Sequence, residues 1–188
     1  AMQVSDRNRD QRSILVLAAV CGVLQLALAP NIGLGNGRAN FALIFSVCIS
    51  LMVGGRKSVL AGFCAGLFFD LSTTGPIGLM SLLLCVSSYV MGIEGRNRVS
   101  GDLGLTMGSF AAHALAVSLA YHIAMLLVGQ ASGFVDVIFL RTLPTAFLTI
   151  IAFIPFAVWL TRAQPSGPSL GGGRGRSSRG SHLDMRGL

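Results

Sequence analysis

Residues 58–78 read SVLAGFCAGLFFDLSTTGPIG, and this stretch decides how the rest of the chain is interpreted. From Ser58 to Gly75 the only charged residue is Asp70. The run is long enough for a membrane-spanning helix, which needs about 20 predominantly apolar residues and at least about 17. Pro76 then interrupts it, because proline lacks a backbone N–H and does not continue a helix. The stretch therefore predicts a helix that crosses a membrane, followed by a sharp break.

Five further apolar runs of similar length lie on either side of this stretch. They are Ser13–Ala29, Ala39–Gly55, Ile77–Ile93, Leu103–Gly129 and Val137–Leu160. A Gly/Asn/Pro-rich loop, Pro30–Asn40, separates the first two. We therefore predict an all-α polytopic membrane protein with six transmembrane helices in one domain, residues 13–161. Residues 1–12 are predicted to form a cytoplasmic N-terminal segment, and residues 162–188 a basic cytoplasmic tail.

The composition agrees with a chain whose main solvent is lipid. Of its 188 residues, 53% are hydrophobic and only 11% are charged, whereas a soluble domain carries about 25% charged residues. The mean hydropathy of +0.72 points in the same direction. The cysteines, Cys21, Cys48, Cys64 and Cys85, all lie inside apolar runs and are interpreted as small buried hydrophobic residues. These features argue against a soluble enzyme.

The basic residues mark the two sides of the predicted membrane. Although the net charge is +7, these residues are confined to the chain ends and to short loops. With six spans, twelve of them share one side: Arg7, Arg9, Arg12, Arg56, Lys57, Arg96, Arg98, Arg162, Arg174, Arg176, Arg179 and Arg186. The other side holds only Arg38 and Arg141. Because cytoplasmic loops carry an excess of Lys and Arg, we predict a multi-pass membrane protein with both termini in the cytoplasm.

The tail, residues 162–188, changes abruptly to a composition of glycine, serine and arginine. Such a segment does not bury enough apolar area to offset the entropy of ordering it, so we predict that it is disordered. Its arginines are expected either to lie on anionic lipid headgroups or to stay solvated while they fix the orientation. The placement of the basic residues argues against nucleic acid as a partner.

Asp70 is the sharpest local feature of the sequence. It lies thirteen residues after Lys57, which is about 20 Å along a helix and about two-thirds of the way across a 30 Å hydrocarbon core. A carboxylate at this depth is a functional candidate by default. The alternative is a structural role, in which Asp70 accepts hydrogen bonds from the broken segment Ser72–Gly78 or pairs with Arg141. We favour the structural role.

Small residues precede Asp70 on the same helix. Gly62 and Gly66 are four residues apart, a spacing that lets a second helix approach closely in a membrane. Irregular backbone such as the Ser72–Gly78 break is tolerated at membrane depth only when protein or a cavity surrounds it. The glycines thus allow a second helix to approach closely, and the break is expected to be buried in protein or to line a cavity.

The sequence contains no recognisable set of catalytic residues. His113 and His122 are nine residues apart on one predicted helix, so they face opposite sides and do not bind one metal ion together. We expect His113 to form a hydrogen bond with a neighbouring helix. No Ser-His-Asp set, phosphate-binding loop, metal-ligand cluster or dinucleotide fingerprint is present. We therefore expect no enzymatic activity, no metal and no cofactor.

One segment resembles the signature of the MreD family of rod shape-determining proteins. That family typically reads G-F-x-x-G-L-x-x-D, then P-L-G, then a tyrosine about eleven residues after the last glycine. The matching positions here are Gly62, Phe63, Gly66, Leu67, Asp70, Pro76, Gly78 and Tyr89, with Ile77 in place of the usual leucine. Arg141-Thr142-Leu143-Pro144 with Pro155 is similar to the last helix of the family. Thr149, where many members have Asn, and Ala39-Asn40 depart from the pattern.

The resemblance implies a non-catalytic scaffold of the cell-wall elongation machinery in the bacterial plasma (inner) membrane. Such proteins pair with an MreC-like single-span scaffold and work beside a RodA-type glycan polymerase, its penicillin-binding transpeptidase and the MreB filament. Their fold is similar to the substrate-binding S-components of energy-coupling-factor vitamin transporters. Under this interpretation Gly62, Gly66, Asp70, Pro76 and Gly78 shape the bundle and its partner surface.

Two alternatives remain open at this stage. A vitamin-binding S-component needs an outward cavity with a few convergent polar groups. The polar residues on the predicted outer side are Asn31, Asn36, Arg38, Asp70, Tyr121, His122, Asp136 and Arg141. An intramembrane enzyme is the other alternative, and it would need a nucleophile or metal set that we do not find.

Overall fold

The computed structural model describes residues 2–34, 36–96, 103–130 and 133–163, with the backbone alone for residues 2–10, 96 and 163. Its α-helices are α1 (Met2–Val23), α2 (Phe41–Met52), α3 (Gly55–Ser72), α4 (Leu79–Arg96), α5 (Leu103–Leu127) and α6 (Leu143–Ala163). The π-helical segment η1 (Leu24–Leu28) continues α1, and η2 (Asp136–Thr142) leads into α6. Two short strands, β1 (Gly33–Leu34) and β2 (Gly37–Arg38), pair antiparallel, with Gly33 opposite Arg38. The described chain is otherwise helical, as predicted.

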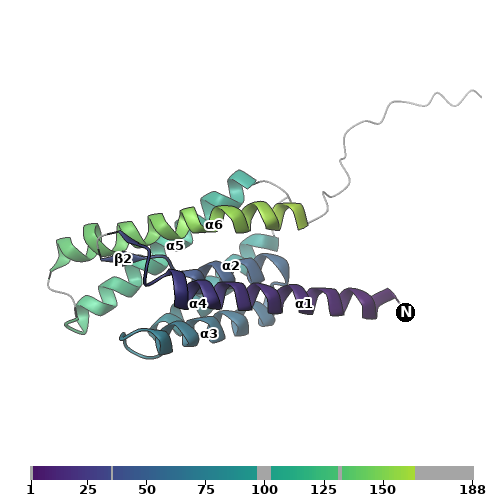
Figure 1. The fold of residues 1–188 in the computed structure, drawn as a ribbon, viewed down its shortest axis with the longest axis horizontal. Coiled ribbons are helices and arrows are strands. Elements are labelled where there is room, and N and C mark those ends of the chain that lie inside the picture. Colours follow the sequence, from purple (N-terminus) through teal and green to yellow (C-terminus); the bar gives the residue numbers. More distant parts are fainter. Residues whose placement is uncertain (1, 35, 97–102, 131–132, 164–188) are drawn as a thin grey trace, which may run out of the picture.

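The helices run side by side along one long axis (Figure 1). The N-terminal end of α1 and the C-terminal end of α6 lie at the same end of this bundle. The β-hairpin and the turn between α3 and α4 lie at the opposite end (Figure 1). Residues 97–102 and 164–188 are outside the described residues. The predicted disorder of the tail therefore stays a prediction.

Helix α2 forms the centre of the bundle. It contacts α1, α3, α4 and α6, and nine of its twelve residues are buried: Phe41, Ala42, Leu43, Ile44, Ser46, Val47, Cys48, Ile49 and Ser50. A helix of this length extends about 18 Å, which is shorter than a hydrocarbon core of about 30 Å. The predicted run Ala39–Gly55 is therefore correct in position but too long. Gly54 ends it with a positive φ of 63°, and α3 begins at the next residue.

Three described helices are long and apolar enough to cross a membrane: Gln11–Leu28, Leu103–Leu127 and Asp136–Arg162. The apolar stretches Phe41–Met52 and Leu79–Gly95 are shorter. Helix α3 carries Arg56, Lys57 and Asp70, which lower its hydropathy. By length and composition, three of the six predicted spans therefore correspond to described helices that could each cross a membrane.

Two boundaries differ from the prediction. Helix α1 begins at Met2, so the backbone of the predicted N-terminal segment continues the first helix. The predicted loop Pro30–Asn40 contains the β-hairpin, whose two-residue strands are too short to leave a periodic pattern in the sequence. The predicted break after α3 is present, and Gly78 has a φ of 98° just before α4 begins.

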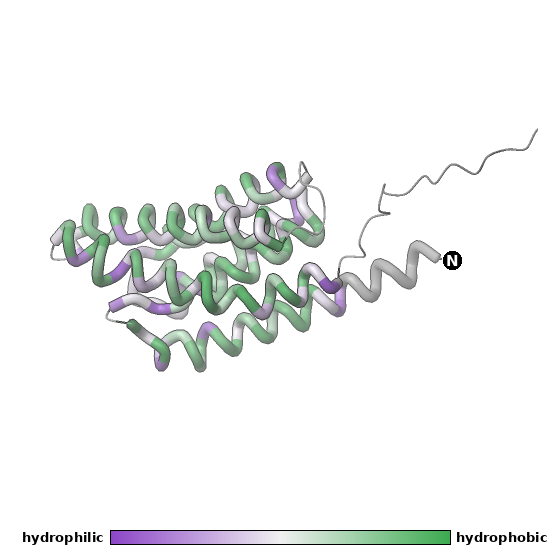
Figure 2. Tube along the Cα trace, turned by 90° about the horizontal axis from the view of Figure 1, so that it is seen from above, coloured by the Kyte–Doolittle hydropathy of each residue, from purple (hydrophilic) through white to green (hydrophobic). Residues whose placement is uncertain are grey.

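Apolar side chains fill the interior and also cover much of the outside. Phe110 of α5 and Phe153 of α6 are fully buried and stack with ring centroids 3.7 Å apart. Figure 2 shows hydrophobic residues along most of the length of the helices. Leu71 and Leu82 are 69% and 63% exposed. A surface of this kind suits lipid or protein partners better than water.

Candidate functional site

The glycines of α3 lie directly against α4. A Cβ added to Gly62 would clash with Ser88 Oγ and would lie 2.8 Å from the Leu84 carbonyl oxygen. A Cβ added to Gly66 would clash with Ser81 Cα and would lie 2.6 Å from the Ser81 backbone nitrogen. Only glycine leaves room for these backbones, so the close helix approach that the spacing predicted is present between α3 and α4.

Asp70 holds the N-terminal end of α4. Its carboxylate accepts hydrogen bonds from the backbone N–H of Gly78 (2.9 Å), Met80 (3.1 Å) and Ser81 (3.2 Å) and from Ser81 Oγ (3.1 Å). The side chain is 1% exposed. The first N–H groups of a helix have no partner within it and carry partial positive charge. A buried carboxylate at this position satisfies them with strong, charge-assisted bonds.

The structure decides between the two structural roles considered for Asp70. Gly78 of the broken segment does donate to the carboxylate, and the hydrogen bonds extend beyond the break to Met80 and Ser81. The other alternative, a pairing with Arg141, is not observed among the described residues. Arg141 Nε instead lies 3.2 Å from Asp136 Oδ2, five residues earlier on the same segment. Arg141 thus pairs with Asp136, and the Asp70 carboxylate bonds the N-terminal end of α4.

The remaining predicted site residues, Pro76, Tyr89 and Pro144, make no hydrogen bond to Asp70 within the described part of the chain. Pro76 forms the turn, and its carbonyl accepts from Leu79 N–H at 3.4 Å. Tyr89 is 62% exposed on the outside of α4. Pro144 is the second residue of α6 and lies against Gly37 of the hairpin, where an added Cβ would be 2.7 Å from Pro144 Cβ. The motif thus combines a buried contact between α3 and α4, formed by Gly62, Gly66 and Asp70 and called the α3–α4 joint below, with one outward-facing tyrosine.

A second buried helix end was not predicted. Asn40 caps α2, because its side chain accepts from Leu43 N–H at 3.0 Å. The Phe41 N–H donates to Gln25 Oε1 at 2.9 Å, and the Asn40 N–H donates to Thr149 Oγ1 at 3.0 Å. Asparagine before an apolar run is a sequence signal for a helix start. The partners Gln25 and Thr149 are distant in sequence and leave no such signal.

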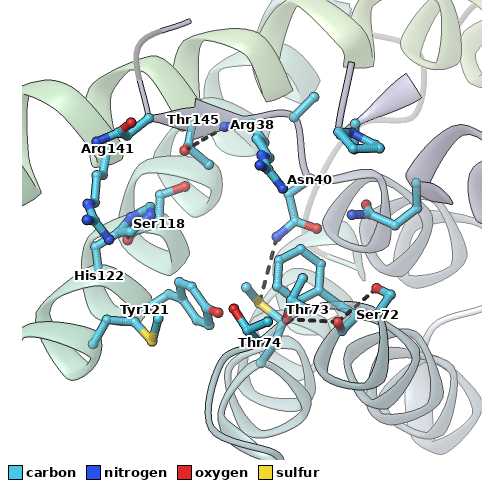
Figure 3. Close-up of a pocket in the computed structure, with 18 of the residues that line it drawn as sticks. Arg38, Asn40, Ser72, Thr73, Thr74, Ser118, Tyr121, His122, Arg141 and Thr145 are labelled. Atoms are coloured by element: carbon cyan, nitrogen blue, oxygen red, sulfur yellow. Dashed lines mark hydrogen bonds between the residues drawn. The ribbon is translucent and has the colours of Figure 1, made fainter. Parts of the chain in front are cut away.

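A polar cavity of about 340 Å³ opens at the hairpin end of the bundle. Figure 3 shows Arg38, Arg141, His122 and Tyr121 around it, together with Asn40 and the threonines of the α3–α4 turn. Of the outer-side residues considered in the sequence, the structure brings five together here: Asn36, Arg38, Tyr121, His122 and Arg141. Asn31, Asp70 and Asp136 do not line the cavity.

Aromatic and polar contacts fix the α5 wall of this cavity. The Tyr121 ring packs edge-on against Phe69 of α3, with ring centroids 5.8 Å apart. His122 Nδ1 lies 2.8 Å from the Ser118 carbonyl oxygen, so this nitrogen carries the proton and donates it. His113 makes the equivalent bond to the Ser109 carbonyl of its own helix at 2.9 Å. The expected bond from His113 to a neighbouring helix is therefore wrong.

Within the described ranges, no three His, Cys, Asp or Glu side chains gather as a metal site would require. Neither curated proteins nor solved structures give a match to this chain. One family model does match, and its description is rod shape-determining protein MreD. The match covers residues 8–162, which is most of the chain and includes every helix from α2 to α5.

Proposed function

We propose that this chain, which belongs to the MreD family of rod shape-determining proteins, acts as a non-catalytic scaffold of the cell-wall elongation complex. Membership gives it a role in rod-shape determination and a place in the membrane. The observation that carries the scaffold proposal is the environment of Asp70. Its hydrogen bonds all hold the end of a helix, which is a structural task.

The proposed topology has six spans, with both termini on the cytoplasmic side of the plasma membrane. The distribution of twelve basic residues against two supports this orientation. The common end of α1 and α6 in the bundle supports an even number of crossings (Figure 1). Helices α2, α3 and α4, which are short or carry charges, would span as parts of the packed bundle. The proposed domain division keeps residues 162–188 as a cytoplasmic tail that lies on anionic lipids.

The proposed partner surface is the outer face of α4. Leu82, Val86, Tyr89 and Ile93 recur at helical spacing and are 63%, 56%, 62% and 46% exposed. For Tyr89, no hydrogen-bond partner exists among the residues that the structure describes. A phenol at membrane depth gains from a protein neighbour that offers one. We assign this face to the single membrane helix of an MreC-like scaffold.

The RodA-type polymerase, its penicillin-binding transpeptidase and the MreB filament belong to the same proposed complex, in direct or indirect contact. The joint between α3 and α4 supports the partner face from inside. Because Gly62, Gly66 and Asp70 fix how α4 lies on α3, they determine the shape of the surface without touching the partner.

Site-specific photo-crosslinking tests this proposal. A photoreactive residue in place of Tyr89 is expected to crosslink a single-span scaffold protein in native membranes. The matched control replaces Leu119 on α5, which is 37% exposed. Crosslinks of equal yield from both positions, or no crosslink from either, would show that the outer face of α4 is not the contact surface.

The second candidate function is an S-component of a vitamin transporter, with the fold likeness that this implies. The polar cavity is the observation that favours it. Purification of the tagged protein from native membranes separates the two candidates. Recovery of an MreC-like protein and wall-synthesis enzymes supports the scaffold. Recovery of paired ATPase subunits with a coupling membrane protein supports the transporter.

A further inference from the structure

The two arginines on the predicted outer side converge on one cavity. Arg38 and Arg141 are far apart in the sequence, yet both line the 340 Å³ cavity and an adjoining one of about 380 Å³. Figure 3 shows their side chains on the rim of the same open space. Basic residues are disfavoured on the outer side of a membrane protein. Their convergence on one cavity therefore suggests that their positive charge binds a ligand.

Specific contacts of the hairpin bring the arginines together. The Asn36 N–H donates to the Leu140 carbonyl at 3.1 Å, and the Arg38 N–H donates to Thr145 Oγ1 at 3.3 Å. Gly37 lies so close to α6 that an added Cβ would be 2.6 Å from the Thr145 backbone nitrogen. These contacts fix β2 against η2 and α6, and with it the backbone of Arg38.

The cavity has an excess of positive charge. Arg141 uses its Nε–H on Asp136, which leaves the other four guanidinium N–H groups for a ligand. Arg38 has no acidic partner among the described residues. The lining contains two guanidinium groups, and the carboxylate of Asp136, which pairs with Arg141 from outside the lining, offsets one of their two charges. Guanidinium groups bind phosphate oxygens by paired hydrogen bonds, and they do so more strongly at a site shielded from water.

An apolar groove adjoins this cavity. It has a volume of about 270 Å³ and lies between α1, α2 and α3. Its lining is mostly small and apolar: Ala18, Cys21, Gly22, Ala42, Phe45, Cys64, Ala65 and Phe68. Gln25 of η1 lines both the groove and the polar cavity. A molecule with a phosphate and a long hydrocarbon chain matches the polar lining of the cavity and the apolar lining of the groove.

We propose that this cavity binds a phosphate-bearing anion through Arg38 and Arg141. The adjoining groove favours an anionic phospholipid, with its headgroup on the arginines and an acyl chain along Gly22. A soluble phosphate ester shares the headgroup chemistry and would use the cavity alone. The proposal does not depend on the scaffold function, because a partner on α4 and a ligand at the hairpin end occupy different faces.

The test measures ligand retention by the purified full-length chain in neutral detergent. Phosphatidylglycerol is one probe and glycerol phosphate is the other. Native mass spectrometry is expected to show one retained phosphatidylglycerol on the wild type. Arg38→Gln and Arg141→Gln are expected to reduce its occupancy about tenfold, because each removes charged hydrogen bonds. The matched control Arg56→Gln, on the exposed start of α3, is expected to retain the lipid.

Substitutions at open glycines test the groove. An added Cβ meets nothing within 4 Å at Gly22 or at Gly108, so both positions accept a larger side chain. Gly22→Leu is expected to weaken phosphatidylglycerol retention about tenfold, and Gly108→Leu on α5 to leave it unchanged. Unaltered thermal unfolding in detergent confirms that each variant is folded.

The outcomes separate the two sources of phosphate. Loss of phosphatidylglycerol in Arg38→Gln and in Gly22→Leu supports the lipid. Thermal stabilisation by glycerol phosphate that Arg38→Gln abolishes and Gly22→Leu preserves supports a soluble ester at the same cavity. Retention that is equal in Arg38→Gln and Arg56→Gln, or absent with both probes, overturns the proposal.

Discussion

Helices α2 and α4 both begin inside the protein, and their first N–H groups are satisfied in different ways. At α4 one buried carboxylate, Asp70, accepts four hydrogen bonds. At α2 the task is divided among three neutral side chains, Asn40, Gln25 and Thr149. The first arrangement depends on a single residue, whereas the second spreads the same task over three elements. Their tolerance of substitution should differ accordingly.

Asp70→Leu should have the largest effect. It leaves three N–H groups and one hydroxyl without an acceptor. Each buried polar group without a hydrogen-bond partner lowers the free energy of unfolding by about 1–3 kcal/mol. We expect a loss of more than about 3 kcal/mol in stability, with insertion into the membrane retained and recovery of the partner abolished. Thermal unfolding in detergent, resistance to alkaline extraction and co-purification measure these three quantities.

Asp136→Leu is the matched control for Asp70→Leu. It removes a carboxylate that is 23% exposed and has one ion pair, so we expect a change of at most about 1 kcal/mol. Equal melting of the two variants would show that Asp70 has no special part in the α4 joint.

Gly66→Leu should be the next most disruptive. Its side chain would have to displace the Ser81 backbone, and such overpacking costs typically about 1–3 kcal/mol. We expect a lower unfolding temperature and loss of partner recovery, because α4 must move away from α3. Gly108→Leu, at an open position on α5, controls for the substitution itself. Partner recovery that survives in Gly66→Leu would contradict the proposed joint.

Thr149→Val should have the smallest effect of the three. It keeps the shape but removes the acceptor of the Asn40 N–H, which costs about 1–2 kcal/mol. Thr161→Val in the same helix is the control, because that hydroxyl bonds only its own helix at the Val158 carbonyl. If Thr149→Val proves as damaging as Asp70→Leu, the neutral arrangement at α2 is no more tolerant than the charged one.

Local patterns carried most of what the sequence predicted. Apolar runs located the helices, proline marked the break, and the glycine spacing indicated a close contact with a second helix, which the structure identifies as α4. Asp70 was recognised because a charge in an apolar run stands out. The family resemblance, which the match to residues 8–162 confirms, rested on this same stretch.

Features that depend on distant partners could not be predicted. The length of α2 follows from Gly54 at one end and from Gln25 and Thr149 at the other. The convergence of Arg38 and Arg141 follows from backbone contacts between the hairpin and α6. None of these pairings has a fixed spacing, so periodicity and composition contain no trace of them.

The α3–α4 joint also has a consequence for how the chain enters the membrane during synthesis. The carboxylate leaves the ribosome before the donors that satisfy it, Gly78, Met80 and Ser81. Under the proposed six-span topology, α3 alone would present an unpartnered carboxyl group to hydrocarbon until these residues emerge, which is unfavourable. Transfer of α3 and α4 from the translocon as one hairpin removes that penalty. Under that topology, the order of translation makes the two helices a single insertion unit.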